Sequence, residues 1–584
     1  MFLTLDANLM YKKAKNLYFR NYLNEASEII HKVISNADII FESKIEFIIL
    51  DCMILNENRD VKKAKLILDE LIVTLKEKDV IFSLIDAQIT LTRTLWRMGN
   101  YDDALNLAQD IKSQMNNLKN SETEKFQNLK ADLLREVATV YWAKGNLDEA
   151  LDNILKSFTI KEKLDRPLET QKILNVIGVT YRMKGELDLS LKYFKQCLEI
   201  EQKYDFKEVP GTYNNIGVIY KTMGQLNEGL TFLKKALEIG LQNNHTSIAG
   251  YFYNVGTIFY EKGDLKEALY HIQQSLERPI NNERFLGPAK SGLGDVYYGM
   301  GNIEKALENY QESLKIKEKI GNKVDITKGI LKLISTYYDE GYNDQVEKYY
   351  QRLEEISENE ENIYVQQHLM LGKAILLRNR DIPLDELSFD SLMDVSSKYV
   401  NIKKIYNEII SEEVKEFDLT ISAIFNLCEI LILELKALGT GSNIGRINIL
   451  IKKLEKIALE ENLFSLMTKT YILKAKMSLF NKDVDEAKEL LETSEKIALE
   501  KGFTQLAKVI KNELAIFDNK EVTQLVENED TTLTDLVSKL QIDNFVISLR
   551  KNRVESYLNE NNTEPSMNDL KVFANQLSKR NIQW

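Results

Sequence analysis

Hydrophobic residues recur along most of the chain at the spacing of a helix face, and glycines separate the resulting segments. Residues 214–239 show the pattern most clearly. The apolar face of the first predicted helix consists of Ile216, Ile219, Tyr220 and Met223. That of the second predicted helix consists of Leu230, Leu233 and Leu237. Gly224 lies between them, where a left-handed residue commonly ends a helix. The segment therefore predicts two packed helices joined by a tight turn.

The same pattern returns every 38 to 40 residues through the middle of the chain. The turn glycines are Gly145, Gly185, Gly224, Gly263, Gly301 and Gly341. Each second helix carries a residue near its start that is usually small: Ala26, Ala64, Ala104, Ala150, Ser190, Gly229, Ala268, Ala306 and Val346. These positions predict about nine repeats before residue 360. Such repeats stack, and each shares its apolar face with its neighbours.

Two further columns on the first helices indicate the kind of repeat. The small column reads Ala138, Gly178, Gly217, Gly256 and Gly294. The aromatic column, three residues later, reads Tyr141, Tyr181, Tyr220, Phe259, Tyr297 and Tyr337. Together with the turn glycine and the small residue five positions beyond it, this pattern resembles the tetratricopeptide repeat, most clearly over residues 85–355. The resemblance implies an all-α fold, an α-solenoid of stacked helix–turn–helix repeats in a right-handed superhelix.

The repeat pattern and its interruptions predict five segments. They are a solenoid of about nine repeats (1–360), an irregular repeat and linker (361–395), a second helical array (396–516), an acidic linker (517–532) and a C-terminal helical tail (533–584). The second array is expected because EKIALE occurs at 455–460 and again at 495–500. It is similar to the C-terminal part of large archaeal tetratricopeptide-repeat proteins. The tail is expected to cap the solenoid or to form a separate module.

Charge and cysteine content narrow the possible environments of the chain. The net charge of −12 argues against a nucleic-acid partner, because phosphate contacts need a basic face. The three cysteines are far apart and form no CxxC motif, which fits a reducing cytoplasm. No basic leader precedes an apolar run, and the most apolar stretch, residues 47–55, is too short to span a bilayer. We therefore expect a cytoplasmic protein with no membrane partner.

No motif in the sequence indicates catalysis. The four histidines are isolated, so a metal site is not expected. GTGSNIG at 439–445 lacks the preceding strand and the Lys-Ser/Thr of a phosphate loop, which favours a turn between helices. The many carboxylates are most simply solvated helix faces. We expect no enzymatic activity and no cofactor.

The resemblance also implies a binding groove, because the first helix of each tetratricopeptide repeat lines the concave side. Two positions per repeat are candidates for ligand contact. The earlier position includes Arg135, Asn175, Asn214 and Tyr253; the later position includes Trp142, Arg182, Lys221, Tyr260 and Tyr298. Amides can bond the backbone of an extended peptide, cations can hold carboxylates, and aromatic rings give flat contact area. The alternative is that these side chains pack against the next repeat.

These columns predict a non-enzymatic adaptor that binds an extended peptide or protein segment. We expect Arg135, Asn175, Arg182, Asn214 and Lys221 to form one strip, and an acidic or carboxylate-bearing segment to bind there. One alternative is a regulator in which a bound peptide or ligand changes the curvature of the solenoid and releases a partner. A weaker alternative is an assembly factor or accessory subunit of an enzyme complex.

Overall fold

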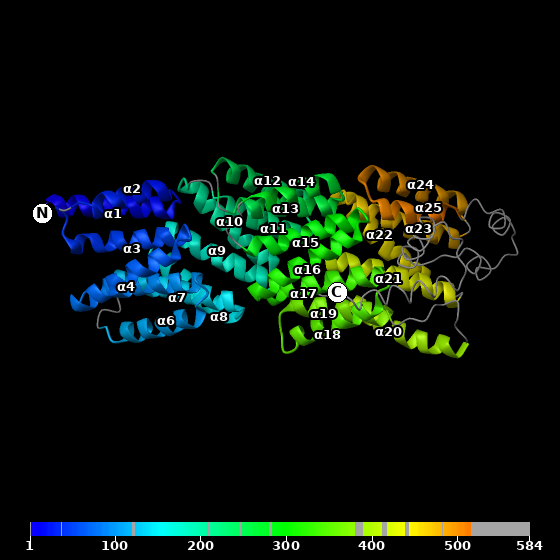
Figure 1. Ribbon diagram of the computed structural model, residues 1–584, viewed down its shortest axis with the longest axis horizontal. Coiled ribbons are helices and arrows are strands. Elements are labelled where there is room, and N and C mark those ends of the chain that lie inside the picture. Colours follow the sequence, from blue (N-terminus) through cyan, green and yellow to red (C-terminus); the bar gives the residue numbers. More distant parts are fainter. Residues whose placement is uncertain are drawn as a thin grey trace. The chain divides into compact units, whose positions relative to one another are not determined.

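The computed structural model describes residues 2–515 apart from ten short gaps, and the regular elements in the described part are all helices (Figure 1). The gaps are residues 37, 119–122, 207–208, 244, 246, 279–282, 380–388, 412–416, 439–442 and 482. The predicted acidic linker at 517–532 and the predicted tail at 533–584 lie outside the described residues. The prediction of an all-α fold is confirmed.

Up to residue 357 the helices alternate as the first and second members of hairpins. The first helices are α1 (Phe2–Phe19), α3 (Phe41–Glu57), α5 (Ile81–Arg97), α7 (Glu124–Lys144), α9 (Pro167–Met183), α11 (Pro210–Thr222), α13 (Ile248–Lys262), α15 (Glu283–Gly299) and α17 (Lys323–Asp339). The second helices are α2 (Leu23–Ile34), α4 (Val61–Glu77), α6 (Tyr101–Asn116), α8 (Leu147–Lys163), α10 (Leu187–Lys203), α12 (Leu226–Gln242), α14 (Leu265–Glu277), α16 (Ile303–Ile320) and α18 (Asn343–Ser357).

Beyond residue 357 the helices continue with less regular lengths. They are α19 (Ile363–Asn379), α20 (Phe389–Ser411), α21 (Phe417–Leu438), α22 (Ile444–Glu461), α23 (Phe464–Phe480), α24 (Val484–Lys501) and α25 (Thr504–Ala515). The two EKIALE segments lie near the ends of α22 and α24, and each helix is followed by a residue with a left-handed backbone, Asn462 or Gly502. The predicted segment boundaries near residues 360 and 395 stay predictions.

The turn inside each hairpin requires a left-handed residue, as the glycine spacing predicted. Gly145 and Gly263 have φ angles of 87° and 84° and end α7 and α13. In the first two hairpins the same place, five residues before the buried small side chain, is taken by Asn21 and Arg59, both with φ of 66°. The absence of glycine there explains why the first two repeats match the pattern weakly.

The small columns mark the places where paired helices approach most closely. The residues of the early second-helix column, Ala26 to Val346, are all buried. On the first helices, a Cβ added at Gly178 would lie 2.8 Å from the Phe194 ring, and one added at Gly294 would lie 2.7 Å from the Tyr310 ring. Larger residues at these glycines would force the two helices of a hairpin apart.

The chain divides into two compact units, residues 1–219 and residues 220–584. In unit 1, α1, α3, α5, α7 and α9 pack in succession, and α9 also contacts α1. In unit 2, α13 packs on α15, α19 contacts α17 and α21, and α23 reaches back to α13. In both units, contacts therefore join first helices that are far apart in sequence.

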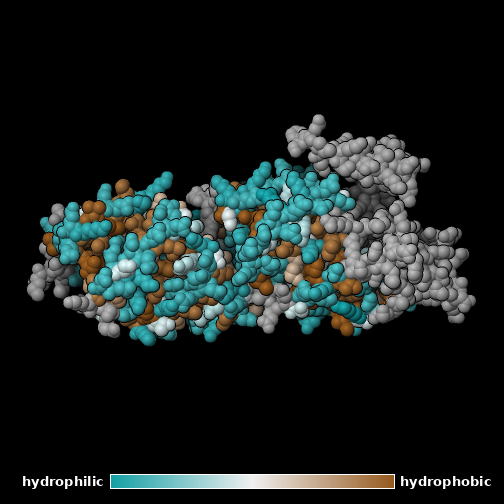
Figure 2. All heavy atoms as spheres, turned by 90° about the horizontal axis from the view of Figure 1, so that it is seen from below, coloured by the Kyte–Doolittle hydropathy of each residue, from teal (hydrophilic) through white to brown (hydrophobic). Residues whose placement is uncertain are grey.

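The distribution of hydrophilic and hydrophobic residues on the surface follows from the packing of the helices. In the view of Figure 2, hydrophilic residues cover most of the coloured surface, and hydrophobic residues form smaller patches between them. Each helix buries one apolar face in the stack and turns a polar face outward, as expected for amphipathic helices. The polar side chains that lie on the inner, first-helix side are therefore the exception.

Candidate functional site

Unit 1 contains a pocket of about 260 Å³ that first helices enclose. We call it the unit-1 pocket; its lining residues are Glu57, Arg93, Trp96, Arg97, Arg135, Glu136, Thr139, Trp142, Lys172, Asn175, Val176 and Val179. These residues come from α3, α5, α7 and α9. Four cationic side chains face two carboxylates, so the lining carries an excess of two positive charges.

The carboxylate of Glu136 holds the inner wall of this pocket together. Arg93 and Arg135 each place Nη2 2.7 Å from Glu136 Oε1, and Trp96 donates from Nε1 to Oε2 at 3.2 Å. Only 3% of the Glu136 side chain is exposed. Burial alone would raise the pKa of Glu136, but the two guanidinium groups outweigh it and lower the pKa to about 2. The carboxylate is thus ionised and fully used by the protein.

Glu57 holds the opposite, more open wall. Its carboxylate pairs with Arg97 Nη2 at 2.9 Å and with Lys172 Nζ at 3.1 Å. Lys172 also donates to Tyr18 on α1 at 2.7 Å, which ties α9 to α1. About a quarter of the Arg97 and Lys172 side chains stays exposed, and Arg97 Nε is buried without a hydrogen-bond partner. Donor capacity therefore remains for an acidic ligand.

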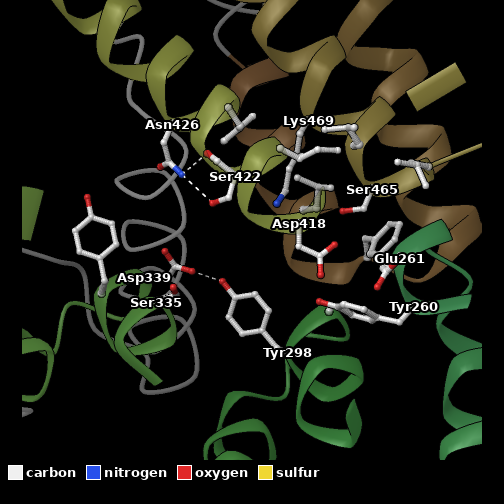
Figure 3. A pocket seen from close by; sticks show the side chains of 18 of the residues that line it. Tyr260, Glu261, Tyr298, Ser335, Asp339, Asp418, Ser422, Asn426, Ser465 and Lys469 are labelled. Carbon is white, nitrogen blue, oxygen red and sulfur yellow. Dashed lines mark hydrogen bonds between the residues drawn. The ribbon is translucent and has the colours of Figure 1, made fainter. Parts of the chain in front are cut away.

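Unit 2 contains a second pocket, of about 430 Å³ (Figure 3). We call it the unit-2 pocket. Its polar lining consists of Tyr260, Glu261, Tyr298, Ser335, Tyr338, Asp339, Glu340, Asp418, Ser422, Asn426, Glu429, Ser465 and Lys469, and its aromatic lining adds Phe417, Phe425 and Phe503. Five carboxylates face one amine, so the balance of charge is the reverse of that in the unit-1 pocket.

The carboxylates of the unit-2 pocket differ in how well they are paired. Asp339 accepts a hydrogen bond from Tyr298, and the Glu429 carboxylate lies 3.8 Å from Arg378. In contrast, Asp418 at the start of α21 makes no hydrogen bond or ion pair with any residue that the structure describes. Among the described residues, Asp418 is therefore the lining carboxylate for which no hydrogen bond or ion pair is seen.

Glu261 is the clearest case of incomplete pairing. Its Oε1 lies 3.1 Å from Lys221 Nζ, whereas its Oε2 is buried and has no hydrogen-bond partner. Burial, with Asp418 adding to it, raises the pKa of Glu261 to about 8 despite Lys221. Figure 3 shows Glu261, Asp418 and Tyr260 on one side of the pocket. An ionised Glu261 therefore lacks part of its stabilisation.

A long-range contact positions the helices that contribute Asp418 and Lys469. Glu461, at the end of α22, accepts from the backbone N–H of Leu226 at 2.8 Å and from that of Asn227 at 3.2 Å. These groups belong to the first turn of α12, where unpaired N–H donors and the helix dipole favour an anion. Lys262 adds a bond to the Glu461 carbonyl at 2.8 Å. Helix α22 is thus attached to α12 and α13 of the same unit.

The structure distributes the predicted groove residues over these two pockets. Arg135, Trp142 and Asn175 line the unit-1 pocket, whereas Tyr260 and Tyr298 line the unit-2 pocket. The remaining predicted residues are outside both linings: Arg182, Asn214, Lys221 and Tyr253.

Those four residues are placed as follows. Lys221 borders the unit-2 pocket through its ion pair with Glu261, and the Tyr253 ring lies 3.2 Å from the position of a Cβ added at Gly292. Arg182 and Asn214 are half-buried on α9 and α11. Arg182 belongs to unit 1 and Lys221 to unit 2, so the single strip that was expected to join them remains a prediction.

Sequence reasoning missed the carboxylates and the irregular helices. Glu57 and Glu136 lie at positions that the two-column interpretation did not consider, and Glu261 directly follows the chosen Tyr260. A charged residue beside a predicted groove position was the available signal. Asp418 and Lys469 lie in the second array, where no periodic column indicated which residues turn inward.

Models of the tetratricopeptide repeat match three segments of the chain, residues 129–203, 208–279 and 289–320. All three segments lie within the range in which the small and aromatic columns were recognised. The matches cover α8 to α10, which belong to unit 1, and α12 to α14 and α16, which belong to unit 2. Each pocket is thus bordered by matched repeats.

Several solved structures are similar to the chain at low sequence identity. A Rap protein complexed with competence and sporulation factor shares 18% identity, covering 58% of this chain and 99% of its own, with a TM-score of 0.42. NprR in complex with its cognate peptide NprX shares 14% identity, covering 63% and 97%, with a TM-score of 0.41. BtubC from P. vanneervenii shares 16% identity, covering 38% and 92%, with a TM-score of 0.32. These scores are too low to transfer a function.

No curated protein matches the chain in sequence. Within the described ranges, no helix combines the length and the apolarity needed to cross a bilayer. The same ranges hold no group of three or more His, Cys, Asp or Glu side chains placed to bind a metal ion. The expected lack of a cofactor and of catalysis stays a prediction.

Proposed function

We propose that the chain, three segments of which match the tetratricopeptide repeat, is a non-enzymatic scaffold whose unit-1 pocket binds a carboxylate-bearing peptide segment. The observation that carries this proposal is the excess of positive charge on an inner, first-helix surface. Two of the four cations, Arg93 and Arg135, are used to hold Glu136. Arg97 and Lys172 are more exposed and share the single carboxylate of Glu57.

The neutral side chains of the pocket suit a peptide rather than a small anion. Trp96 and Trp142 offer broad flat surfaces, and Val176 and Val179 add apolar area beside the cations. Asn175 contributes an amide that can both donate to and accept from a peptide backbone. A side-chain or C-terminal carboxylate would bond Arg97 and Lys172 while the rest of the segment lies against these surfaces. The unit-1 pocket would then attach the chain to the partner protein that carries this peptide segment.

A peptide selection with the full chain tests this proposal. The probe is a resin-bound library of random seven-residue peptides with free carboxyl termini, incubated with the labelled protein. We expect the selected peptides to be rich in Asp, Glu or exposed C-termini, and their amidated Gln/Asn counterparts to bind more weakly. Selection of no peptide, or of peptides indifferent to the carboxylates, would contradict the proposal.

Two matched variants assign the binding to the pocket. Asn175→Ala removes only the amide and should weaken the selected acidic peptides by up to about tenfold, as expected for lost hydrogen bonds to a peptide backbone. Lys156→Gln alters an exposed lysine on α8 that pairs with Asp152 and lies outside the pocket lining. It should leave the affinity unchanged. Equal affinities for the two variants would place the binding elsewhere.

A further inference from the structure

The unit-2 pocket has mainly carboxylates among its charged lining residues, whereas the groove that the sequence predicted was expected to be basic. We propose that it is a second ligand site, and that it binds the cationic side chain of a basic peptide segment, with arginine the best fit. The proposal rests on the proposed function insofar as the cation is carried by a peptide. The expected acidic ligand does not suit this pocket.

The charge of the lining is the first reason. Glu261, Asp339, Glu340, Asp418 and Glu429 face the pocket, against Lys469. Lys221 and Lys328 act on Glu261 and Arg378 lies beside Glu429, and with Lys469 these four cations are fewer than the five carboxylates. An anionic ligand would add to the repulsion among these groups, whereas a cation would relieve it.

The second reason is the unused acceptor at Glu261. Its Oε2 is buried and has no partner, and Asp418, on the same side of the pocket, forms no bond with the described residues (Figure 3). Burying a carboxylate oxygen without a partner is costly, so such an atom in a cavity indicates a missing donor. A planar guanidinium has five N–H donors and can bridge two carboxylates at once.

The third reason is the aromatic surface around these carboxylates. Tyr260 lies beside Glu261 and Asp418 in Figure 3, and Phe417 and Phe503 belong to the same lining. The faces of aromatic rings attract cations, and guanidinium groups stack on them. The cavity volume of about 430 Å³ accommodates a long side chain together with part of its backbone.

The serine side chains supply contacts for the remaining part of the segment. Ser335, Ser422 and Ser465 line the pocket from three helices, α17, α21 and α23. Asn426 is engaged within the protein, because its Nδ2 donates to the Ser422 carbonyl at 2.7 Å and its Oδ1 accepts from Arg378, so the serine hydroxyls are the main neutral groups for a ligand. Neutral donors and acceptors of this kind bond a peptide backbone without regard to its sequence. They complement an arginine that fixes the position of the segment.

The library used for the unit-1 pocket tests this inference with the full chain. We expect a second class of selected peptides that contain arginine. Each such peptide is remade with citrulline, a neutral analogue of nearly the same shape, and both forms are measured by fluorescence anisotropy. The arginine form should bind about tenfold or more tightly, as expected for bonds to an ionised partner.

Variants of the pocket separate a specific site from general attraction to an acidic protein. Asp418→Asn changes one exposed carboxylate, and it should remove most of the preference for arginine over citrulline. Glu261→Gln should do the same. Glu238→Gln on α12 is the control, because Glu238 is an exposed carboxylate outside the lining.

Each outcome decides between the two proposals. If acidic peptides are selected but none depends on arginine, the cation site is wrong and the proposed function stands. If arginine peptides bind equally to wild type, Asp418→Asn and Glu261→Gln, they bind only by general attraction to an acidic surface. The assignment of the site to the unit-2 pocket is then wrong. If no peptide of any kind is selected, both proposals fail.

Discussion

Glu136 and Glu261 are both glutamates on first helices, one in each unit. Their surroundings nevertheless shift the pKa of the two carboxyl groups in opposite directions. In unit 1, Glu136 receives two guanidinium groups and an indole N–H, and its pKa falls to about 2. In unit 2, Glu261 has one lysine partner and one bare oxygen, and its pKa rises to about 8 because burial dominates. One inner carboxylate is thus fully paired within the protein, whereas the other keeps a buried oxygen without a hydrogen-bond partner.

The comparison extends to what each pocket leaves unused. The unit-1 pocket has a buried donor without a partner at Arg97, and the unit-2 pocket has a buried acceptor without one at Glu261. A ligand that satisfies the first must bring an acceptor, and a ligand that satisfies the second must bring a donor. The unpaired atoms thus indicate ligands of opposite charge more directly than the net charge of the chain does.

The largest effect is expected from Glu136→Gln. This change leaves Arg93 and Arg135 buried without their carboxylate, and breaking such a buried pair costs about 3–5 kcal/mol. A urea titration should show the loss through the fluorescence of Trp96 and Trp142, which border the network. An unfolding free energy equal to that of wild type would mean that the network does not hold unit 1 together.

The matched change in unit 2, Glu261→Gln, should behave differently. The wild-type carboxylate keeps its proton in the folded state up to about pH 8 but loses it near pH 4.5 when unfolded, so this group lowers stability as pH rises between those values. Glu261→Gln lacks this loss. The free energy of unfolding of the variant, relative to that of wild type, should therefore increase as the pH is raised from 4.5 to 8. A gain that shrinks with rising pH would refute the assigned direction.

Glu461→Ala should have an intermediate effect that is confined to unit 2. It removes the carboxylate that accepts from the first-turn N–H groups of α12, a contact comparable to a helix cap and worth about 1 kcal/mol. Hydrogen exchange should accelerate at the start of α12 and at the end of α22. Affinity for arginine peptides should fall, while acidic peptides bind unit 1 as before. Faster hydrogen exchange in α5 and α7 instead would contradict the expectation that the effect is confined to unit 2.

The affinity of arginine peptides should change severalfold with pH. This change is smaller than the effects above, and it distinguishes the unit-2 pocket from the unit-1 pocket. A bound guanidinium keeps Glu261 ionised, so affinity for arginine peptides should rise from pH 6.5 and level off above about pH 8. Lys221, Lys328 and Asp418 also act on Glu261, and the variant Glu261→Gln should abolish the rise. Anisotropy titrations across this range provide the measurement. A rise that persists in Glu261→Gln would assign the titration to another group.

The smallest effect is expected at the hairpin turns, away from both pockets. Arg59 and Gly99 hold the same left-handed turn position in neighbouring repeats of unit 1. Arg59→Gly should stabilise by a few tenths to about 1 kcal/mol, because relief of the left-handed strain exceeds the added freedom of the unfolded chain. Gly99→Ala should destabilise by a similar amount, although no atom would contact the new Cβ. Both values come from the same urea titration.

The fold was largely predictable because its constraints are local and repeated. A turn glycine, a small buried residue five positions later and an apolar face recur often enough to be recognised without a structure. Asn21 and Arg59 escaped the pattern because their backbone conformation, rather than their residue type, matches the other turns. The helices beyond residue 396 were less predictable because no turn glycine recurs at a fixed spacing among them.

The site was predictable only in part because pairing depends on contacts between distant residues. Arg135 and Asn175 were found from their column positions, and the unit-1 pocket does bring them together with Trp142. Their neighbours Glu57 and Glu136 could be recognised only once the ion pairs were seen. The unit-2 pocket needs Asp418, which is 157 residues beyond Glu261 and lies on a helix with no repeat pattern.

The most direct test of two pockets with opposite preferences is one crossed binding measurement on the full chain. One acidic and one arginine peptide from the selection are titrated against wild type, Asn175→Ala and Asp418→Asn. We predict that Asn175→Ala weakens only the acidic peptide and that Asp418→Asn weakens only the arginine peptide. If both variants weaken the same peptide, or neither variant weakens any peptide, the account of two opposite pockets is wrong.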